Sequence, residues 1–150
     1  MSGAGNVRGP GVFSAMEVAA SGLSAERGRM NVIASNLANA RTTKGADGTP
    51  YKRLDPVFGA KPVAPGSFDP VLRRVSGVEI TGVRADTSQG QLVYDPGHPD
   101  ANAQGYVEYP NVNVVTEMVN LMTASRAYEA GVTSIESLKS MARSALKIGQ

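Results

Sequence analysis

His98 is the chain's only histidine, and the carboxylates of Asp95 and Asp100 lie within three residues of it. One imidazole and two carboxylates form a donor set that can bind a zinc ion. Here all three donors fall in one turn rich in proline and glycine, so no second element of structure is available to fix their geometry. We therefore interpret His98 as part of a structured turn, and we expect neither a metal site nor a cofactor.

Sequence motifs for catalysis are absent. A Ser-His-Asp triad needs its nucleophile on a rigid turn, and the chain has no GxSxG segment. It also lacks GxxxxGKS, GxxxxGKT and GxGxxG, the glycine-rich loops that bind phosphate groups. The lack of any cysteine excludes thiol catalysis, cysteine-ligated metals and disulfides. We expect that the protein is not an enzyme, and no residue is a candidate for catalysis, cofactor binding or metal binding.

Charge and hydropathy limit the partners of the chain. Its 15 basic and 13 acidic residues give a net charge of +2, and the basic residues are scattered apart from the pairs Lys52-Arg53 and Arg73-Arg74. Nucleic-acid binding needs a clustered basic face, so we expect no such partner. No stretch approaches the roughly 20 apolar residues of a membrane span, so we expect no direct membrane insertion. The N-terminus lacks the apolar core of a secretory signal, which by itself favours the cytoplasm.

The last quarter of the chain has the apolar periodicity of one long helix, which we place at 112–148. Its apolar seam has alternating steps of three and four residues, as in a coiled coil. The seam residues are Met118, Leu121, Ser125, Tyr128, Val132 and Ile135. Leu138 continues the seam with a step of three where four is due, which predicts local overwinding. Asn113 and Thr116 are both candidates for the N-terminal cap.

A second amphipathic helix is predicted at 12–40, after a glycine-rich and flexible N-terminus at 1–11. Its seam residues Met16, Leu23, Met30 and Leu37 fall seven apart, with Ala19 and Ile33 at intermediate positions. Matching seams at the two ends of the chain predict that the helices pair as a coiled coil. Val119 and Met122 lie outside the seams, where a two-stranded coil does not bury them. Such residues need other partners, which a multi-subunit wall of helices or a small four-helix dimer would supply.

The segment between the helices, 41–111, has a different composition. It holds eight of the nine prolines, which are costly inside a helix. Apolar and polar residues alternate over 77–83, as in a half-buried strand. The shorter strand candidates are 56–58, 90–94 and 106–109, and the predicted loop is 60–70. The predicted fold class is therefore α+β and mainly α, with paired long N- and C-terminal helices and a small, irregular β excursion between them.

Four residues outside the seams are candidates for setting register within or between subunits. Asn39 can cap the end of the first helix, and a buried Asn36 can fix the register of a helix bundle. Gly22 permits another backbone to approach closely. Arg126 can reach a neighbouring subunit, or it can form a surface ion pair with Glu129 three residues later.

Three segments resemble the axial proteins of the bacterial flagellum. Residues 117–130 read EMVNLMTASRAYEA, which is similar to the C-terminal signature of that family. SGLSA at 21–25 and RMNVIASNLAN at 29–39 resemble its N-terminal signature. The segment at 92–113, LVYDPGHPDANAQGYVEYPNVN, resembles the proximal rod proteins in particular. The resemblance covers roughly residues 14–148.

The resemblance implies a structural subunit of the proximal rod, the drive shaft within the flagellar basal body. Such a subunit polymerises with copies of itself and with other rod proteins, and it transmits torque by packing alone. The resemblance also implies export through the flagellar type III apparatus without a cleaved signal, and a final place in the periplasmic space. That expectation replaces the cytoplasmic one.

Two alternatives stay open. One is another axial protein, such as a distal rod or hook-junction subunit, and the segment at 92–113 argues against it because only the terminal motifs are shared across the family. The other is a cytoplasmic coiled-coil adaptor or export chaperone, which would persist as a discrete small oligomer rather than co-purify with basal bodies.

Overall fold

The computed structural model describes residues 12–63, 70 and 74–148. Two long helices and four strands follow one another in the order α1, β1, β2, β3, β4, α2. The helices come from the two ends of the chain and the strands from the segment between them, so the predicted class, α+β and mainly α, is confirmed. The predicted flexible segment at 1–11 lies outside the described residues. No helix in the part of the chain that the structure describes is long and apolar enough to cross a membrane.

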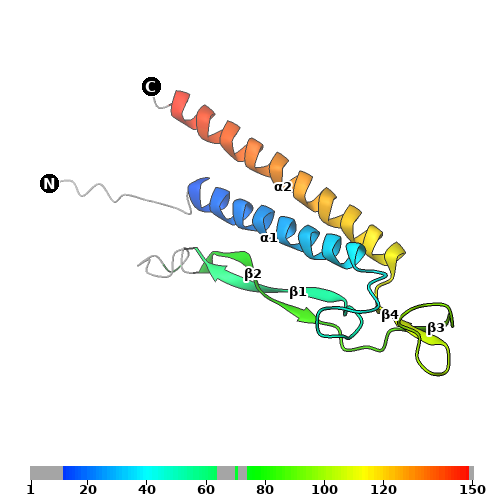
Figure 1. Ribbon diagram of the computed structural model, residues 1–150. Coiled ribbons are helices and arrows are strands. Elements are labelled where there is room, and N and C mark those ends of the chain that lie inside the picture. The colour runs from blue at the N-terminus through cyan, green and yellow to red at the C-terminus, as the bar shows by residue number, and fades with distance from the viewer. Residues whose placement is uncertain (1–11, 64–69, 71–73, 149–150) are drawn as a thin grey trace.

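Helix α1 (Val12–Ala38) and helix α2 (Val114–Ile148) lie side by side and run in opposite directions (Figure 1). The predicted ranges, 12–40 and 112–148, each differ from these by two residues at one end. With a rise of about 1.5 Å per residue, α1 is about 40 Å long and α2 about 52 Å. The last turns of α2 therefore extend beyond the start of α1.

Side chains hydrogen-bond to backbone groups at the end of α1 and at the start of α2. The amide of Asn39 donates to the carbonyl of Ser35 at 2.9 Å, which satisfies one of the last carbonyls of α1. At the start of α2, the side-chain oxygen of Asn113 accepts from the backbone N–H of Thr116 at 3.0 Å. Asn113 rather than Thr116 is therefore the N-terminal cap.

Strand β1 (Leu54–Pro62) pairs in antiparallel fashion with β2 (Ser76–Ala85) to form a two-stranded ribbon. This ribbon lies along α1 (Figure 1). The backbone N–H of Val78 donates to the hydroxyl of Ser21 in α1 at 3.0 Å, so one hydrogen bond joins the middle of β2 to the helix.

Strand β3 (Gln91–Tyr94) pairs with β4 (Tyr106–Tyr109) in a second, shorter antiparallel ribbon. The rings of Tyr94 and Tyr106 pack edge to face across it, with 5.2 Å between their centroids. Val107 of β4 is buried, whereas all four residues of β3 are exposed. The second ribbon lies near the end of the molecule where α1 stops and α2 begins (Figure 1).

Each predicted strand is present, although β1 and β2 are longer than expected. The predicted loop at 60–70 begins too early, because β1 continues to Pro62, which pairs with Ser76. A proline at the end of an edge strand costs no ladder hydrogen bond, so its position there does not oppose strand formation.

Two glycines lie where another element comes very close to a helix. A Cβ atom on Gly28 would lie 2.5 Å from the Cδ1 atom of Ile80 in β2, and one on Gly131 would lie 2.7 Å from Leu23 in α1. Both distances are shorter than van der Waals contact, so the absence of a side chain allows these approaches. Gly22, for which we predicted a close approach, has nothing within 4 Å of the same point. Among the described residues, no other element therefore packs against the Cβ position of Gly22.

The hydrophobic interior of the subunit is small. Among the described residues, four apolar side chains are buried almost completely: Ala25, Ile33, Val107 and Ala124. None is aromatic and two are alanines, so little apolar area leaves water when the single chain folds. The largest fully buried side chains include Asn36 and Glu117, which are polar.

We predict that Asn113→Ala destabilises the protein by about 1 kcal/mol, because it leaves a backbone N–H of the first turn of α2 without its partner. Thr116→Ala is the matched control, since Thr116 is exposed and its side chain does not cap the helix. Denaturant unfolding of the two variants measures the difference. Equal loss of stability in both would contradict the assignment of Asn113 as the cap.

Candidate subunit interface

The side of α2 that packs against α1 follows an unbroken heptad pattern. Eight positions with alternating steps of four and three residues are buried or half-buried: Glu117, Leu121, Ala124, Tyr128, Gly131, Ile135, Leu138 and Ala142. This is the spacing of a coiled-coil seam. The pattern has no slip after Ile135, so the predicted overwinding has no counterpart in it.

The observed seam of α2 differs from the predicted one at every second position. Leu121, Tyr128, Ile135 and Leu138 belong to both seams, whereas Ser125 and Val132 are half-buried beside it. Met118 is 55% exposed and lies outside the seam, because Glu117 takes the inward position in that turn. The apolar periodicity therefore predicted Met118 as the seam residue in place of its buried neighbour Glu117.

On α1 the predicted seam residues face inward to different degrees. Ile33 is buried, and the other four are half-buried: Met16, Leu23, Met30 and Leu37. Leu23 lies against Gly131 of α2, and Met30 lines a hollow together with Leu121 and Ser125. The structure therefore brings several predicted seam residues of the two helices together, but it leaves most of them partly in contact with solvent.

Helix α2 also carries a large apolar surface that no part of the described chain covers. Its residues have steps of three, one and three, which place them on one side of a helix: Val115, Met118, Val119 and Met122, which are 55–72% exposed. We call these four residues the open face. Contiguous apolar surfaces of this kind on soluble proteins mark interaction sites.

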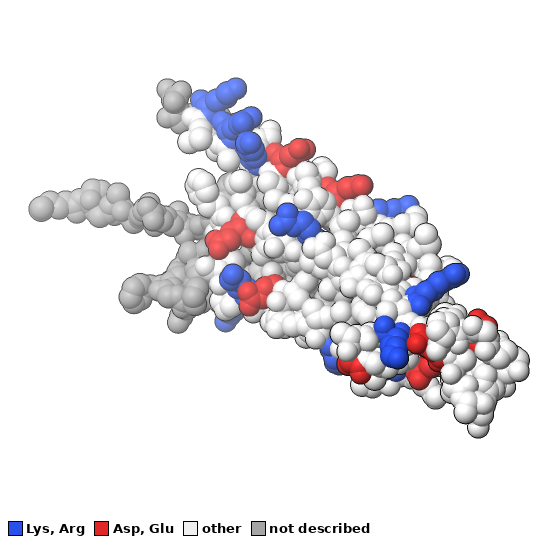
Figure 2. All heavy atoms as spheres, in the orientation of Figure 1, with Lys and Arg blue, Asp and Glu red and all other residues white. Residues whose placement is uncertain are grey.

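Few charges oppose contacts between copies of the chain. Figure 2 shows Lys, Arg, Asp and Glu side chains scattered over a largely uncharged surface. On the face that Figure 2 shows, basic side chains gather along the last turns of α2. Lys139, Arg143 and Lys147 have helical spacing in those turns. No charged residue separates the members of the open face except Glu117, which is buried.

Asn36 is the centre of a polar contact that joins three elements. Its side chain is completely buried, and its amide group donates to the carbonyl of Leu54 at 2.8 Å and to Glu117 Oε2 at 3.0 Å. Its oxygen accepts from the backbone N–H of Leu54 and from the hydroxyl of Tyr51, each at 2.9 Å. The prediction that Asn36 lies buried at a helix contact fits this position, and β1 as well as α2 takes part.

Glu117 is the acid of this contact, and its side chain is 1% exposed. Its Oε1 atom accepts from Arg53 Nε at 2.8 Å, and Arg53 also pairs with Asp55 at 2.8 Å. The hydrogen bond to Glu117 raises the pKa of Arg53 above its ordinary value, so the guanidinium stays charged. A buried carboxylate needs such a partner, because an isolated charge away from water is very costly.

The same contact extends to the segments that flank the second ribbon. The side-chain oxygen of Asn111 accepts from the backbone N–H of Arg53 at 2.8 Å, and its amide donates to the carbonyls of Asp86 and Ser88, each at 3.2 Å. We call Asn36, Tyr51, Arg53, Asn111 and Glu117 the polar junction. The hydrogen bond from the N–H of Ser88 holds the pKa of the Asp86 carboxyl below its ordinary value.

Sequence reasoning missed Tyr51, Arg53 and Glu117 as parts of the site. One signal for Glu117 was available, because the acid lies four residues before Leu121 and seven before Ala124, in phase with the observed seam. An acid at a seam position in the first turn of a helix favours a buried pair with a base. The sequence carries no comparable signal for Tyr51 or Arg53, which belong to the irregular chain between α1 and β1.

The structure does not bring the other predicted register residues, Asn39, Arg126 and Gly22, together. Asn39 caps the end of α1, as described above. Arg126 is exposed beside the hollow that Met122 and Glu129 also line, and none of the ion pairs among the described residues involves it. Arg126 and Gly22 therefore stay predictions for contacts with other subunits.

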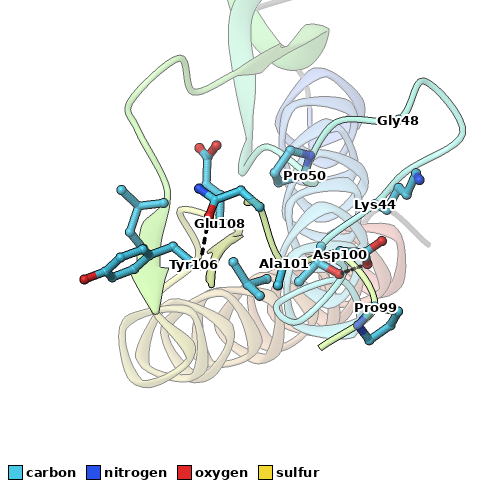
Figure 3. Close-up of a pocket in the computed structure, with 12 residues that line it drawn as sticks. Lys44, Gly48, Pro50, Pro99, Asp100, Ala101, Tyr106 and Glu108 are labelled. Carbon is cyan, nitrogen blue, oxygen red and sulfur yellow. Dashed lines mark hydrogen bonds between the residues drawn. The ribbon is translucent and has the colours of Figure 1, made fainter. Parts of the chain in front are cut away.

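A cavity of about 450 Å³ lies between the loop at 43–50 and the segment that leads into β4. Figure 3 shows Tyr106 and Glu108 on one side of it and Lys44 and Asp100 on the other. Both carboxylates already have partners, since Asp100 accepts from Thr43 at 2.8 Å and Glu108 lies 3.6 Å from Lys52. The cavity therefore presents no free acid to a metal ion or a substrate.

His98 takes part in a turn. Its N–H donates to the carbonyl of Asp95 at 3.2 Å, and its Nδ1 atom accepts from the N–H of Asp100 at 3.1 Å. Its ring packs edge to face with Tyr109 at 6.3 Å. The imidazole thus holds the loop that forms one wall of the cavity.

Comparison with known proteins relates most of the chain to flagellar rod proteins. Residues 16–46 match the family described as flagella basal body rod protein, and residues 103–148 match flagellar basal body rod FlgEFG protein C-terminal. The flagellar basal-body rod protein FlgC of Borreliella burgdorferi is 44% identical over 93% of this chain and 99% of that protein. FlgC of Escherichia coli O157:H7 is 43% identical over 93% and 98%, and that of Bacillus subtilis is 40% identical over 92% and 98%.

We predict that Ala124→Leu destabilises the pairing of α1 and α2 by about 1–3 kcal/mol, because it forces extra volume into a seam position with no exposed surface. Ala127→Leu, one turn away on the exposed side of α2, should change the free energy of unfolding by less than about 0.5 kcal/mol. Thermal unfolding of both variants tests the observed seam. If Ala127→Leu were the more damaging change, the seam would be misplaced.

Proposed function

This chain belongs to the FlgC family of flagellar basal-body rod proteins, and from that membership we propose how it forms a rod. It is a structural subunit of the proximal rod. Its helix pair makes the contacts between copies, and its β ribbons form an outer contact layer. Function in this account comes from packing alone, so the subunit is not an enzyme and needs no cofactor.

The open face of α2 is the observation that supports this proposal most directly. Four large apolar side chains on one side of a long helix have no cover within the described chain. The exposed side of α1 carries the small residues Ala20, Ser24, Ala34 and Ala38, with Arg27 and Asn31 between the two pairs. Large side chains on one copy can pack between small ones on the next. Because the two surfaces differ, the contact is heterologous and repeats into a ring or a helical filament rather than closing as a dimer.

Contacts with other rod proteins involve the ribbons in this proposal. Each ribbon exposes large apolar side chains: Val57, Phe58 and Val83 in the first, and Leu92, Tyr94 and Tyr106 in the second. Two-stranded ribbons are only marginally stable alone, so they gain from a further surface. We place the outer contacts with neighbouring rod components on these residues.

The route to the rod is part of the proposal. The flagellar type III apparatus exports its substrates as unfolded chains, and this chain has no cysteine that could crosslink it before export. Its small hydrophobic interior also favours easy unfolding. We propose that the subunit passes through this apparatus and acts where the rod crosses the periplasmic space.

The alternatives have less support. The three FlgC relatives named above align over at least 92% of this chain, and that span includes the segment between the helices as well as the terminal motifs. A distal rod or hook-junction subunit would share mainly the ends. The open face does not favour a cytoplasmic adaptor or export chaperone over a rod subunit, because both would need an apolar contact surface. The relatives are rod proteins, which favours the rod subunit.

We predict that Met122→Asp abolishes rod assembly and swimming while leaving the free energy of unfolding within about 0.5 kcal/mol of the original. The residue is 58% exposed in the single chain, but its charge would be buried without a partner in the assembly. Basal bodies viewed by electron microscopy and swimming in soft agar, in cells that express only the variant, give the readout.

Ser134→Asp is the matched control, since it adds the same charge on another exposed side of α2. It should leave assembly intact. Complete rods and normal swimming with Met122→Asp would contradict the assignment of the open face.

A further inference from the structure

The polar junction connects both β ribbons to the helix pair. We infer that it fixes the orientation of the ribbons relative to the helices, and so determines the shape with which the subunit enters the rod. This inference rests on the proposed function for its biological consequence, but the orientation itself is a property of the single chain. Asn36, Arg53 and Glu117 are positioning residues in this sense.

The side-chain amide of Asn36 pairs with the backbone of Leu54. The side-chain amide of Asn36 donates to the carbonyl of Leu54 and accepts from its N–H, at 2.8 and 2.9 Å. The amide therefore takes the place of a neighbouring strand at the first residue of β1. This double contact fixes which side of the amide is the donor and which is the acceptor.

Glu117 accepts the remaining hydrogen of the Asn36 amide. Because the orientation of Asn36 is fixed, its remaining amide hydrogen must point to an acceptor, which is Glu117 Oε2 at 3.0 Å. The other oxygen accepts from Arg53 Nε at 2.8 Å. Both carboxylate oxygens are therefore required as acceptors, and a glutamine would place a donor against either Asn36 or Arg53. An ionised glutamate is the one side chain of this shape that satisfies both partners.

The backbone of Arg53 links this contact to the second ribbon. Arg53 donates its backbone N–H to Asn111 and accepts from the N–H of Asp86 at 2.7 Å. Asn111 lies between β4 and α2, and Asp86 lies between β2 and β3. The chain segments at both ends of the second ribbon are thus held to the same arginine.

Two contacts hold the first ribbon to α1 apart from the junction: Ile80 packs closely against Gly28, and the N–H of Val78 donates to Ser21. Apolar packing around these contacts is incomplete. A cavity of about 330 Å³ lies between α1 and the first ribbon, lined by residues that include Ser21, Ala25 and Ile80. Of the almost completely buried apolar side chains in the described residues, Ala25 alone lines this contact. Loose apolar contacts tolerate several orientations, whereas a fully satisfied polar network permits one.

Buried ion pairs suit this role. Replacing such a pair by apolar residues of similar volume is often neutral or stabilising, while the pair can specify a unique arrangement. The junction should therefore influence the orientation of the ribbons more than the stability of the chain.

The experiment measures two distances inside the purified chain by spin labels on introduced cysteines, which are unique because the natural chain has none. The exposed pair Gln104→Cys and Glu129→Cys reports the second ribbon relative to α2, and Asn31→Cys with Glu129→Cys reports the helix pair. Labelled chain is diluted into unlabelled chain so that only intramolecular distances are recorded. Each pair is combined with Glu117→Gln, with the double change Arg53→Met and Glu117→Met, or with the matched control Glu136→Gln.

The expected result is a single narrow distance for both pairs in the parent chain and in Glu136→Gln. In Glu117→Gln and in the double variant, the distance from the ribbon to α2 should broaden or shift, while the distance within the helix pair should not change. An unchanged ribbon distance in both variants would overturn the inference. So would simultaneous loss of both distances in the double variant, which would show that the junction supports the whole fold. Failure of the chain to form rods would affect only the proposed function, because neither distance depends on assembly.

Discussion

The hydrogen bond between Asn36 and Glu117 joins residues 81 positions apart, and we infer that the orientation of the strands relative to the helices depends on it. It brings the end of α1 to the start of α2 and, through Arg53 and the backbone of Leu54, attaches the strands between them. Closing a loop of this length has an entropic cost that rises only slowly with its size. A small set of well-satisfied polar contacts can therefore fix how the strands lie against the helix pair where a large hydrophobic interior is lacking.

The reliance on polar contacts inside the chain and the exposure of the open face have the same explanation. A chain that uses its longest helix to contact neighbours cannot bury the same apolar side chains inside itself. Met118, Val119 and Met122 are exposed in the single chain, and we propose that another subunit covers them. Isolated helices are marginal without such packing. We infer that the subunit is ordered near the polar junction and incomplete along α2 until neighbouring copies cover that helix.

The fold class and the helix positions could be predicted from the sequence because they depend on local patterns. Prolines are confined to the middle of the chain, apart from Pro10, and the seams repeat at helical spacing. The phase of the α2 seam could not be predicted as easily. Periodicity favours Met118 over Glu117 because it scores apolar character, whereas the structure buries the acid beside Arg53. The close approaches at Gly28 and Gly131 were equally out of reach, since their partners, Ile80 and Leu23, are distant in the sequence.

Amide hydrogen exchange tests the central claim that neighbouring subunits complete the helix pair. The dilute monomer should show measurable protection near the polar junction, at residues 30–38 and 116–124, and little protection in α2 beyond Ile135. In isolated rods the whole of α2 should become strongly protected, because the apolar side chains of neighbouring copies then cover it. Strong and uniform protection of both helices in a verified monomer, unchanged on assembly, would contradict the account, since the helix pair would then be stable without its neighbours.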